Sequence, residues 1–207
     1  MISRMIAEGM LQKMDMSNIP NLKNINELYL NQSYDPTNEY SVPYTWGVLG
    51  LIYNTRLVED ESVVASWGAL WSEAYMDNIL MINNSKDAFG LTFMYLGLPI
   101  NAESTEQVDK AVELLKAQKN VIQAYVADEI FDKMIGEEAA IAPYFNGDAV
   151  TMIQDNPDLA FSIPMEGSNI FTDCLCIPKE SQKRELAEMY INFMLEPEVG
   201  MANTDAI

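Results

Sequence analysis

Asn78-Ile79-Leu80-Met81-Ile82-Asn83-Asn84-Ser85-Lys86-Asp87 decides the fold class, because a short apolar run passes through a polar turn into a helical pattern. We predict a strand over 78–82 and a helix over about 86–96. A strand, a polar turn and a helix in succession are the repeating unit of an α/β protein.

The rest of the chain continues this alternation. We predict a helix over 105–119, where Ser104 can cap the first turn and Gln107 occupies the reciprocal capping-box position. Strands alternating with helices predict an α/β fold with largely parallel strand pairing. The other predicted elements are helices over 2–14, 66–75, 128–135 and 182–194, a helix after 146–147, a short helix from Pro197, and extended segments over 121–125, 139–145 and 159–163.

A long extended stretch at 42–54 marks a boundary between two lobes. Gly47 and Gly50 lie inside it. Interior glycines are typical of strands that another backbone approaches closely, or that cross from one lobe to another. We therefore place the lobe boundary within this stretch.

The net charge restricts the partners. The 207 residues include 31 acidic and 12 basic side chains, which gives a formal charge of −19. This excess repels nucleic-acid phosphates and anionic membranes, so we expect neither as a partner. It favours a cationic ligand, although solubility alone is an equally good reason for it.

Composition also excludes several chemistries. The chain has no histidine, which rules out a histidine-based catalytic triad and histidine-rich zinc sites within it. Neither a phosphate-binding glycine motif nor acidic residues at metal-ligand spacing occur, so we expect no cofactor and no metal. Cys174 and Cys176 are two residues apart on a predicted strand and are poorly placed to bond each other, so we interpret them as buried or partner-facing thiols.

The predicted strand 170–178 carries the first candidate site residues. Phe171 and Asp173 are two residues apart and leave the same face of a strand. A ring beside a carboxylate suits an organic ammonium ion, because the ring contacts methylenes while the acid takes the charge. The alternative is an edge strand with a solvated Asp173.

Two more candidates follow strands elsewhere, where ligands of open α/β sheets commonly bind. Asp87 falls in a first helical turn and Phe145 ends the strand 139–145. If these residues converge with 170–178, they form an apolar slot with two carboxylates, suited to an organic amine. The alternatives are that Asp87 only complements the helix dipole, that Asn84 or Ser85 only caps the helix, and that Phe145 is a core ring.

An enzymatic alternative uses the same acids. Asp87 and Asp173 could act as the acid and base of a glycoside hydrolase. Nothing in the sequence supplies the carboxylate separation or the raised pKa that this chemistry needs. We therefore expect a binding protein and not an enzyme.

Several longer motifs resemble a known family. They are Ile6-Ala7-Glu8-Gly9-Met10-Leu11-Gln12-Lys13-Met14-Asp15, Tyr40-Ser41-Val42-Pro43-Tyr44-Thr45-Trp46-Gly47, Ser66-Trp67-Gly68-Ala69-Leu70-Trp71, Phe145-Asn146-Gly147, Ile170-Phe171-Thr172-Asp173 and Tyr190-Ile191-Asn192-Phe193-Met194-Leu195-Glu196-Pro197. In this order they resemble the extracytoplasmic spermidine/putrescine-binding proteins of ABC importers, within the two-lobed periplasmic-binding-protein superfamily. The resemblance covers nearly the whole chain.

The resemblance implies roles for five residues. Asp87 matches an acid, usually glutamate, that binds an amine nitrogen, and Phe145 matches an aromatic wall. Phe171 and Asp173 match the aromatic and the aspartate of the later strand. Asn84 stands where spermidine binders have a second acid. Because an amide cannot neutralise an ammonium ion, this departure favours a diamine such as putrescine.

The resemblance also implies the organisation and setting. We expect a type II-like two-lobed α/β fold with 1–45 in the first lobe, 46–165 as a complete second lobe and 166–207 returning to a first lobe that is truncated at both ends. The expected ligand is a polyamine held in an interlobe cleft, and the expected partners are the ABC permease subunits. We expect a monomer in the periplasm, or on the outer face of the cell membrane as a lipoprotein. Another small cationic organic solute is the alternative ligand.

Overall fold

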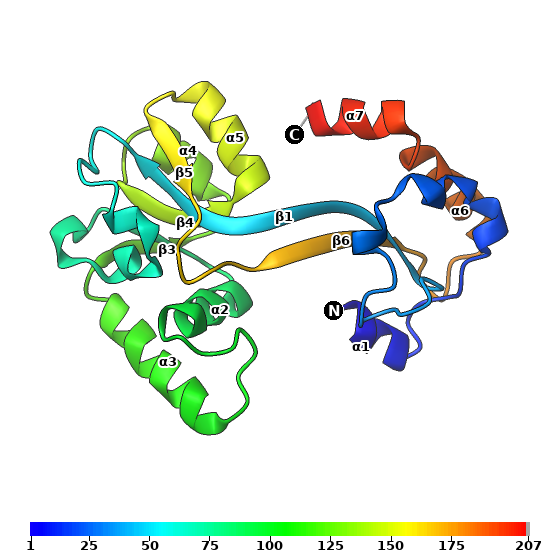
Figure 1. Ribbon diagram of the computed structural model, residues 1–207, viewed down its shortest axis with the longest axis horizontal. Coiled ribbons are helices and arrows are strands. Elements are labelled where there is room, and N and C mark those ends of the chain that lie inside the picture. Colours follow the sequence, from blue (N-terminus) through cyan, green and yellow to red (C-terminus); the bar gives the residue numbers. More distant parts are fainter. Residues whose placement is uncertain (206–207) are drawn as a thin grey trace. The chain divides into compact units, whose positions relative to one another are not determined.

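The computed structural model describes residues 1–205 and contains two compact units (Figure 1). Unit 1 consists of Met1–Trp46 together with the chain from Phe171 onward. Unit 2 is the continuous segment Gly47–Ile170. The lobe bounds predicted from the sequence were 46 and 165, and the assignment of these units to lobes stays a prediction.

Unit 2 is built on a sheet with strand order β3-β2-β4-β1-β5. Figure 1 labels β1, β3, β4 and β5 of this sheet. β2 is parallel to both β3 and β4, whereas β1 is antiparallel to β4 and β5. The prediction of largely parallel pairing was wrong for β1. The segment 55–78 returns the chain to the edge where β1 ends, so β2 starts there and runs back across the sheet. The strands are β1 (Ser41–Asn54), β2 (Ile79–Ile82), β3 (Ile122–Val126), β4 (Ile141–Phe145) and β5 (Leu159–Ser162).

Both faces of this sheet are buried, which explains the continuous apolar runs of its strands. Side chains alternate between faces along a strand. Ile79 and Met81 enter one core with helices α2 (Ser85–Tyr95) and α3 (Thr105–Gln118). Leu80 and Ile82 enter the other core with α4 (Glu129–Ile135) and α5 (Asn146–Asp155). Unit 2 therefore has a three-layer α/β architecture.

The predicted start of α3 is confirmed, with one change in capping. The Ser104 side chain accepts the Gln107 N–H at the start of α3, as predicted. The Gln107 side chain accepts the N–H of Glu103 at 2.7 Å, instead of the N–H of Ser104. The reciprocal bond of the capping box is therefore displaced by one residue.

Two helices predicted from apolar spacing were wrong. The helix expected over 2–14 is only α1 (Ile2–Ala7), because Gly9 has φ of 66° and Leu11 pairs with Pro178 as a β-bridge. The helix expected over 66–75 is two short 3-10 helices, Trp67–Trp71 and Glu73–Tyr75.

Unit 1 combines β6 (Ile170–Cys176), which pairs with β1, with helices α6 (Arg184–Met194) and α7 (Pro197–Asp205). Its core contains Met14, Ile19, Val42, Ile177, Ile191 and Leu195. The Glu188 side chain is fully buried and accepts hydrogen bonds from the Asp15 N–H at 2.8 Å and the Asn18 amide at 2.7 Å. These bonds hold the N-terminal segment on α6. Within residues 1–205, no helix is long and apolar enough to cross a membrane.

Candidate functional site

The carboxyl ends of β2, β3 and β4 meet at one edge of the unit 2 sheet, because β2 is parallel to both neighbours. In open α/β sheets this edge is the usual place for a ligand. Asn84 and Asp87 follow β2, Asp128 follows β3, and Phe145 ends β4. The fold thus gathers three sequence-predicted site residues at one sheet edge.

Asp87 lies in the first turn of α2 and is partly buried. Burial raises the pKa of its carboxyl group above the ordinary value, and the charge of Lys86 opposes this shift. Within the described chain, its carboxylate has no hydrogen bond and no ion pair. Asp87 is therefore an acid that has lost part of its hydration without gaining a protein partner.

Asn84 is exposed and is the N-cap of α2. Its side-chain oxygen accepts the Lys86 N–H at 3.0 Å. The structure thus shows Asn84 in the role of a helix cap, which was one of the alternatives from the sequence. One lone pair of this oxygen remains for another donor.

Phe145 lies at the junction of β4 and α5 and is partly buried. It packs against the hydrophobic cores on both faces of the sheet. Its ring centroid is 5.2 Å from that of Tyr144, with the planes tilted by 46°. Phe145 is therefore held at the sheet edge between the α2 side and the α5 side.

The structure adds Asp148, an acid that the sequence reasoning missed. It lies partly buried in the first turn of α5, and burial together with the charge of Asp128 raises the pKa of its carboxyl group. Within residues 1–205, no Lys or Arg pairs with it. The signal that identified Asp87, an acid in the first turn after a strand end, applies equally to Asp148.

Phe171 and Asp173 lie on β6 in unit 1, where Phe171 is partly buried and Asp173 is exposed. Thr172, which lies between them, lines a cavity. Cys174 is on the same side of the strand as Thr172, and its Sγ atom is 3.4 Å from the Tyr34 hydroxyl oxygen. Because side chains alternate along a strand, Phe171 and Asp173 share the face opposite to Thr172.

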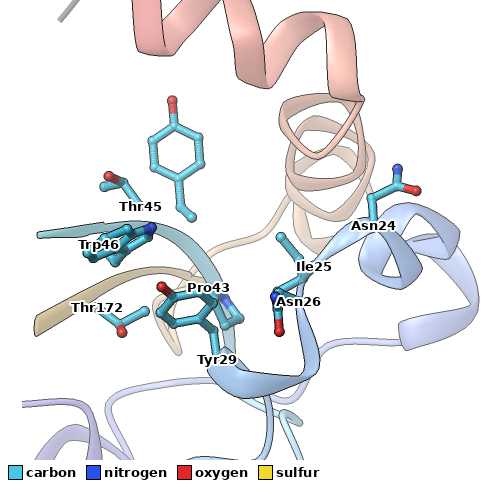
Figure 2. A pocket seen from close by; sticks show the side chains of 9 residues that line it. Asn24, Ile25, Asn26, Tyr29, Pro43, Thr45, Trp46 and Thr172 are labelled. Atoms are coloured by element: carbon cyan, nitrogen blue, oxygen red, sulfur yellow. The ribbon is translucent and has the colours of Figure 1, made fainter. Parts of the chain in front are cut away.

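The cavity next to Thr172 has a volume of about 190 Å³ and lies within unit 1 (Figure 2). The rings of Tyr29 and Trp46 stack beside it with centroids 5.9 Å apart. The other lining residues are Asn24, Ile25, Asn26, Pro43, Tyr44 and Thr45. No acid lines this cavity, so it lacks the group that an ammonium ion requires.

The two cysteines are free, as expected for residues two apart on one strand. Burial raises the pKa of the Cys174 thiol, and burial with the charge of Cys174 raises that of Cys176 to about 11. Thiols with raised pKa values are poor nucleophiles at neutral pH. Within residues 1–205, no three His, Cys, Asp or Glu side chains form a metal-binding group.

Comparison with known sequences identifies the family. The sequence profile described as "Bacterial extracellular solute-binding protein" matches residues 1–207. The chain belongs to this family. This family is described as one of solute-binding proteins and not of enzymes, which excludes the glycosidase alternative.

Individual relatives agree with the family resemblance. The "Spermidine/putrescine-binding periplasmic protein" of Salmonella typhimurium is 30% identical over 206 residues, which are 100% of this chain and 59% of the relative. The "Putrescine-binding periplasmic protein SpuD" of Pseudomonas aeruginosa is 24% identical and is 61% covered. The chain thus spans about three-fifths of the length of these relatives.

Solved structures confirm the α/β fold of the two-lobed binding proteins, of which this chain spans only part. The substrate-binding protein PotD of a spermidine/putrescine ABC transporter from Streptococcus pneumoniae is 36% identical with a TM-score of 0.86. This comparison covers 99% of the chain and 63% of the PotD chain. A putative spermidine/putrescine ABC transporter from Listeria monocytogenes is 35% identical with a TM-score of 0.92, over 97% of the chain and 62% of that protein.

Proposed function

We propose that the chain is part of the extracytoplasmic solute-binding component of an ABC importer and that it binds a polyamine, putrescine or spermidine. The names of the relatives support this proposal, since they describe spermidine/putrescine-binding and putrescine-binding proteins. The proposed partners are the membrane subunits of the importer. The proposed location is the periplasm, or the outer face of the cell membrane as a lipoprotein; a relative from Treponema pallidum is described as a lipoprotein.

One observation carries the ligand class: the partly buried, unpaired carboxylate of Asp87. Burial has already removed part of its hydration, and among residues 1–205 no Lys or Arg forms an ion pair with it. An ammonium ion bound to Asp87 would supply the missing partner through a charge-assisted hydrogen bond. A neutral solute would leave the charge uncompensated, so we propose a cationic ligand.

Aromatic rings complete the proposed contacts. Each unit offers one aromatic and one acid from the sequence-predicted set: Phe145 with Asp87 in unit 2, and Phe171 with Asp173 in unit 1. Rings of this kind pack on the methylenes between amine groups and attract the cation. We propose that Asp87 and Asp173 accept ammonium groups while Phe145 and Phe171 contact the alkyl chain.

Asp148 extends the proposal within unit 2. Phe145 contacts both cores of the sheet, and the helices carrying Asp87 and Asp148 pack into different cores. An alkyl chain lying across Phe145 would have an acid toward each side. We propose that Asp148 is the second ammonium acceptor of unit 2, in place of the amide of Asn84.

The test is a two-dimensional NMR titration of the 207-residue chain, which detects binding in the millimolar range. We expect putrescine to shift the backbone amides of 84–88 and 145–149, and the uncharged 1,4-butanediol to leave them unchanged. A titration with spermidine tests whether the site prefers a diamine, as the amide of Asn84 suggests. A titration with agmatine tests the alternative that the ligand is another small cationic solute.

Charge-neutralising variants make the test specific. Asp87→Asn and Asp148→Asn should each raise the putrescine dissociation constant about tenfold or more, the range for a charge-assisted hydrogen bond of about 1.5–3 kcal/mol. Asp155→Asn is the matched control, because it removes the same charge from an exposed position on α5. Equal loss in the control, or no shifts with any amine, would contradict the proposed polyamine site.

A further inference from the structure

The two cysteines of the chain lie together on the face of β6 that the proposed polyamine contacts do not use. Cys174 and Cys176 are two residues apart on this strand, so their side chains leave the same face. Phe171 and Asp173 leave the opposite face. Both thiols are free and partly buried. Because the chain has no other cysteine, two sulfur ligands can meet only here.

The geometry of a strand keeps these two sulfurs from forming a disulfide. Residues two apart on a strand are separated by about 6.7 Å, and Cβ atoms on the same face are separated by about the same distance. A disulfide needs its two Cβ atoms about 3.5–4.5 Å apart. Cys174 and Cys176 therefore remain a pair of thiols as long as β6 keeps its extended backbone.

The same spacing suits a metal ion that binds two sulfurs in a line. Two metal–sulfur bonds of about 2.3 Å, the length of a zinc–thiolate bond, place the sulfurs about 4.6 Å apart. Rotation about the two Cα–Cβ bonds moves the sulfurs toward each other, so this separation is within reach without a change in the backbone. Soft ions such as Hg²⁺ and Cu⁺ prefer thiolates and are stable with two ligands. Zn²⁺ needs four, and within residues 1–205 no third His, Cys, Asp or Glu completes a group with this pair.

The surroundings of the pair favour an ion whose complex is neutral. Burial is the main cause of the raised pKa of both thiols, and the charge of Asp35 adds to it. Asp35 is itself buried, and its carboxylate accepts hydrogen bonds from the Tyr40 N–H, the Ser41 N–H and the Ser41 hydroxyl. An added negative charge is therefore unfavourable next to the thiols. Hg²⁺ in place of the two thiol protons gives a neutral complex, whereas Cu⁺ gives a complex with one negative charge.

We propose that Cys174 and Cys176 form a binding site for a soft metal ion that takes two sulfur ligands, and that this site prefers divalent Hg²⁺ to monovalent Cu⁺. On binding, two metal–sulfur bonds form, the two S–H bonds break and both protons pass to the solvent, with no change of oxidation state. The Tyr34 hydroxyl lies 3.4 Å from Sγ of Cys174 and can donate to the thiolate that forms. The proposal revises the expectation of no metal, because two sulfurs are enough for such an ion. It does not depend on polyamine binding.

The first experiment is native mass spectrometry of the reduced 207-residue chain with one equivalent of Hg²⁺ and an excess of 2-mercaptoethanol, a neutral competitor with a single thiol. We expect one ion per chain, with two protons lost. Cys174→Ala and Cys176→Ala should each retain the ion at least about tenfold less well, because the second thiol of the original chain acts at a high effective concentration. In two-dimensional NMR spectra, Hg²⁺ should shift the backbone amides of 172–176 and leave those of 84–88 and 145–149 unchanged, which separates this site from the proposed polyamine site.

A matched control keeps two thiols and changes only the face of one. In the double variant Leu175→Cys with Cys176→Ala, the thiols at 174 and 175 leave opposite faces of β6, so this variant should retain Hg²⁺ no better than the single variants. Its NMR spectrum shows whether it is folded. Cu⁺ should be retained less well than Hg²⁺ against the same competitor, since both ions bind that competitor through the same kind of sulfur. Two Hg²⁺ ions per chain, or equal retention by a single variant or by the folded double variant, would overturn the proposed site, and equal retention of Cu⁺ would overturn the preference for a divalent ion.

Discussion

Replacing Gly50 by alanine should destabilise unit 2 because the position has no room for a methyl group. Gly50 lies in β1 opposite Tyr144 of β4. A Cβ atom there would be 2.3 Å from Cζ of Phe161 and 2.7 Å from the carbonyl oxygen of Ser162. Overpacking of this kind typically costs about 1–3 kcal/mol. Because one contact is to the backbone of β5, which cannot rotate away, we expect a loss of about 2–3 kcal/mol in the free energy of unfolding.

Urea unfolding followed by tryptophan fluorescence measures this loss, since Trp67 is fully buried in the unit 2 core. Gly147→Ala is the matched control: no atom lies within 4 Å of the position that its Cβ would take, and α5 favours alanine by about 0.5–1 kcal/mol. In a Phe161→Ala background the cost of Gly50→Ala should fall, because the ring contacts are gone, without disappearing, because Ser162 remains. A Gly50→Ala loss below about 0.5 kcal/mol, or one unchanged by Phe161→Ala, would refute the steric argument.

Three further predictions concern polar groups that are buried or partly buried. Glu188→Gln should destabilise unit 1 by about 1.5–3 kcal/mol in urea unfolding, since the buried carboxylate accepts two N–H donors of the N-terminal segment. Cys176, with a pKa raised to about 11 by burial, should be alkylated at pH 7 at least about tenfold more slowly in the native chain than in urea, because the smaller thiolate fraction outweighs the higher nucleophilicity of that thiolate. Asp148→Asn should stabilise the protein at pH 7 and have no effect near pH 3, because the pKa of the carboxyl group is raised in the folded state and its charged form therefore costs stability as the pH rises. Thermal unfolding across this pH range measures the gain, and a gain that persists at pH 3 would contradict the prediction.

The sequence predicted elements well where an apolar run has polar ends, and poorly where distant residues decide the structure. β2 is apolar and is bounded by asparagines, so both its ends could be predicted directly. The methionine spacing of 2–14 fits a helix, but Leu11 pairs with Pro178, far along the chain. Helical spacing contains no information about such a partner, and the left-handed Gly9 shows where the helix actually ends.

The candidate site was predictable to a similar degree. Asp87 and Phe145 could be placed because the ends of parallel strands share a sheet edge. The strand alternation that groups Phe171 with Asp173 is also local, and Thr172 lies on the opposite face, next to the cavity of unit 1. The capping bond of Asn84 was one of two interpretations, because sequence position cannot separate a cap from a ligand.

Asp148 and Asn84 together determine how many acids the sheet edge of unit 2 offers to a cationic ligand. The amide at 84 removes an acid on the α2 side of the sheet edge, and on its own this implies a weaker site for amines. Asp148 adds a partly buried acid on the α5 side, with Phe145 in contact with both cores between them. Asp87 and Asp148 thus place two partly buried acids at the sheet edge that Phe145 occupies. Since the spacing of acids selects the spacing of ammonium groups, the position of Asp148 in the proposed site should influence the preference among amines more than the total negative charge does.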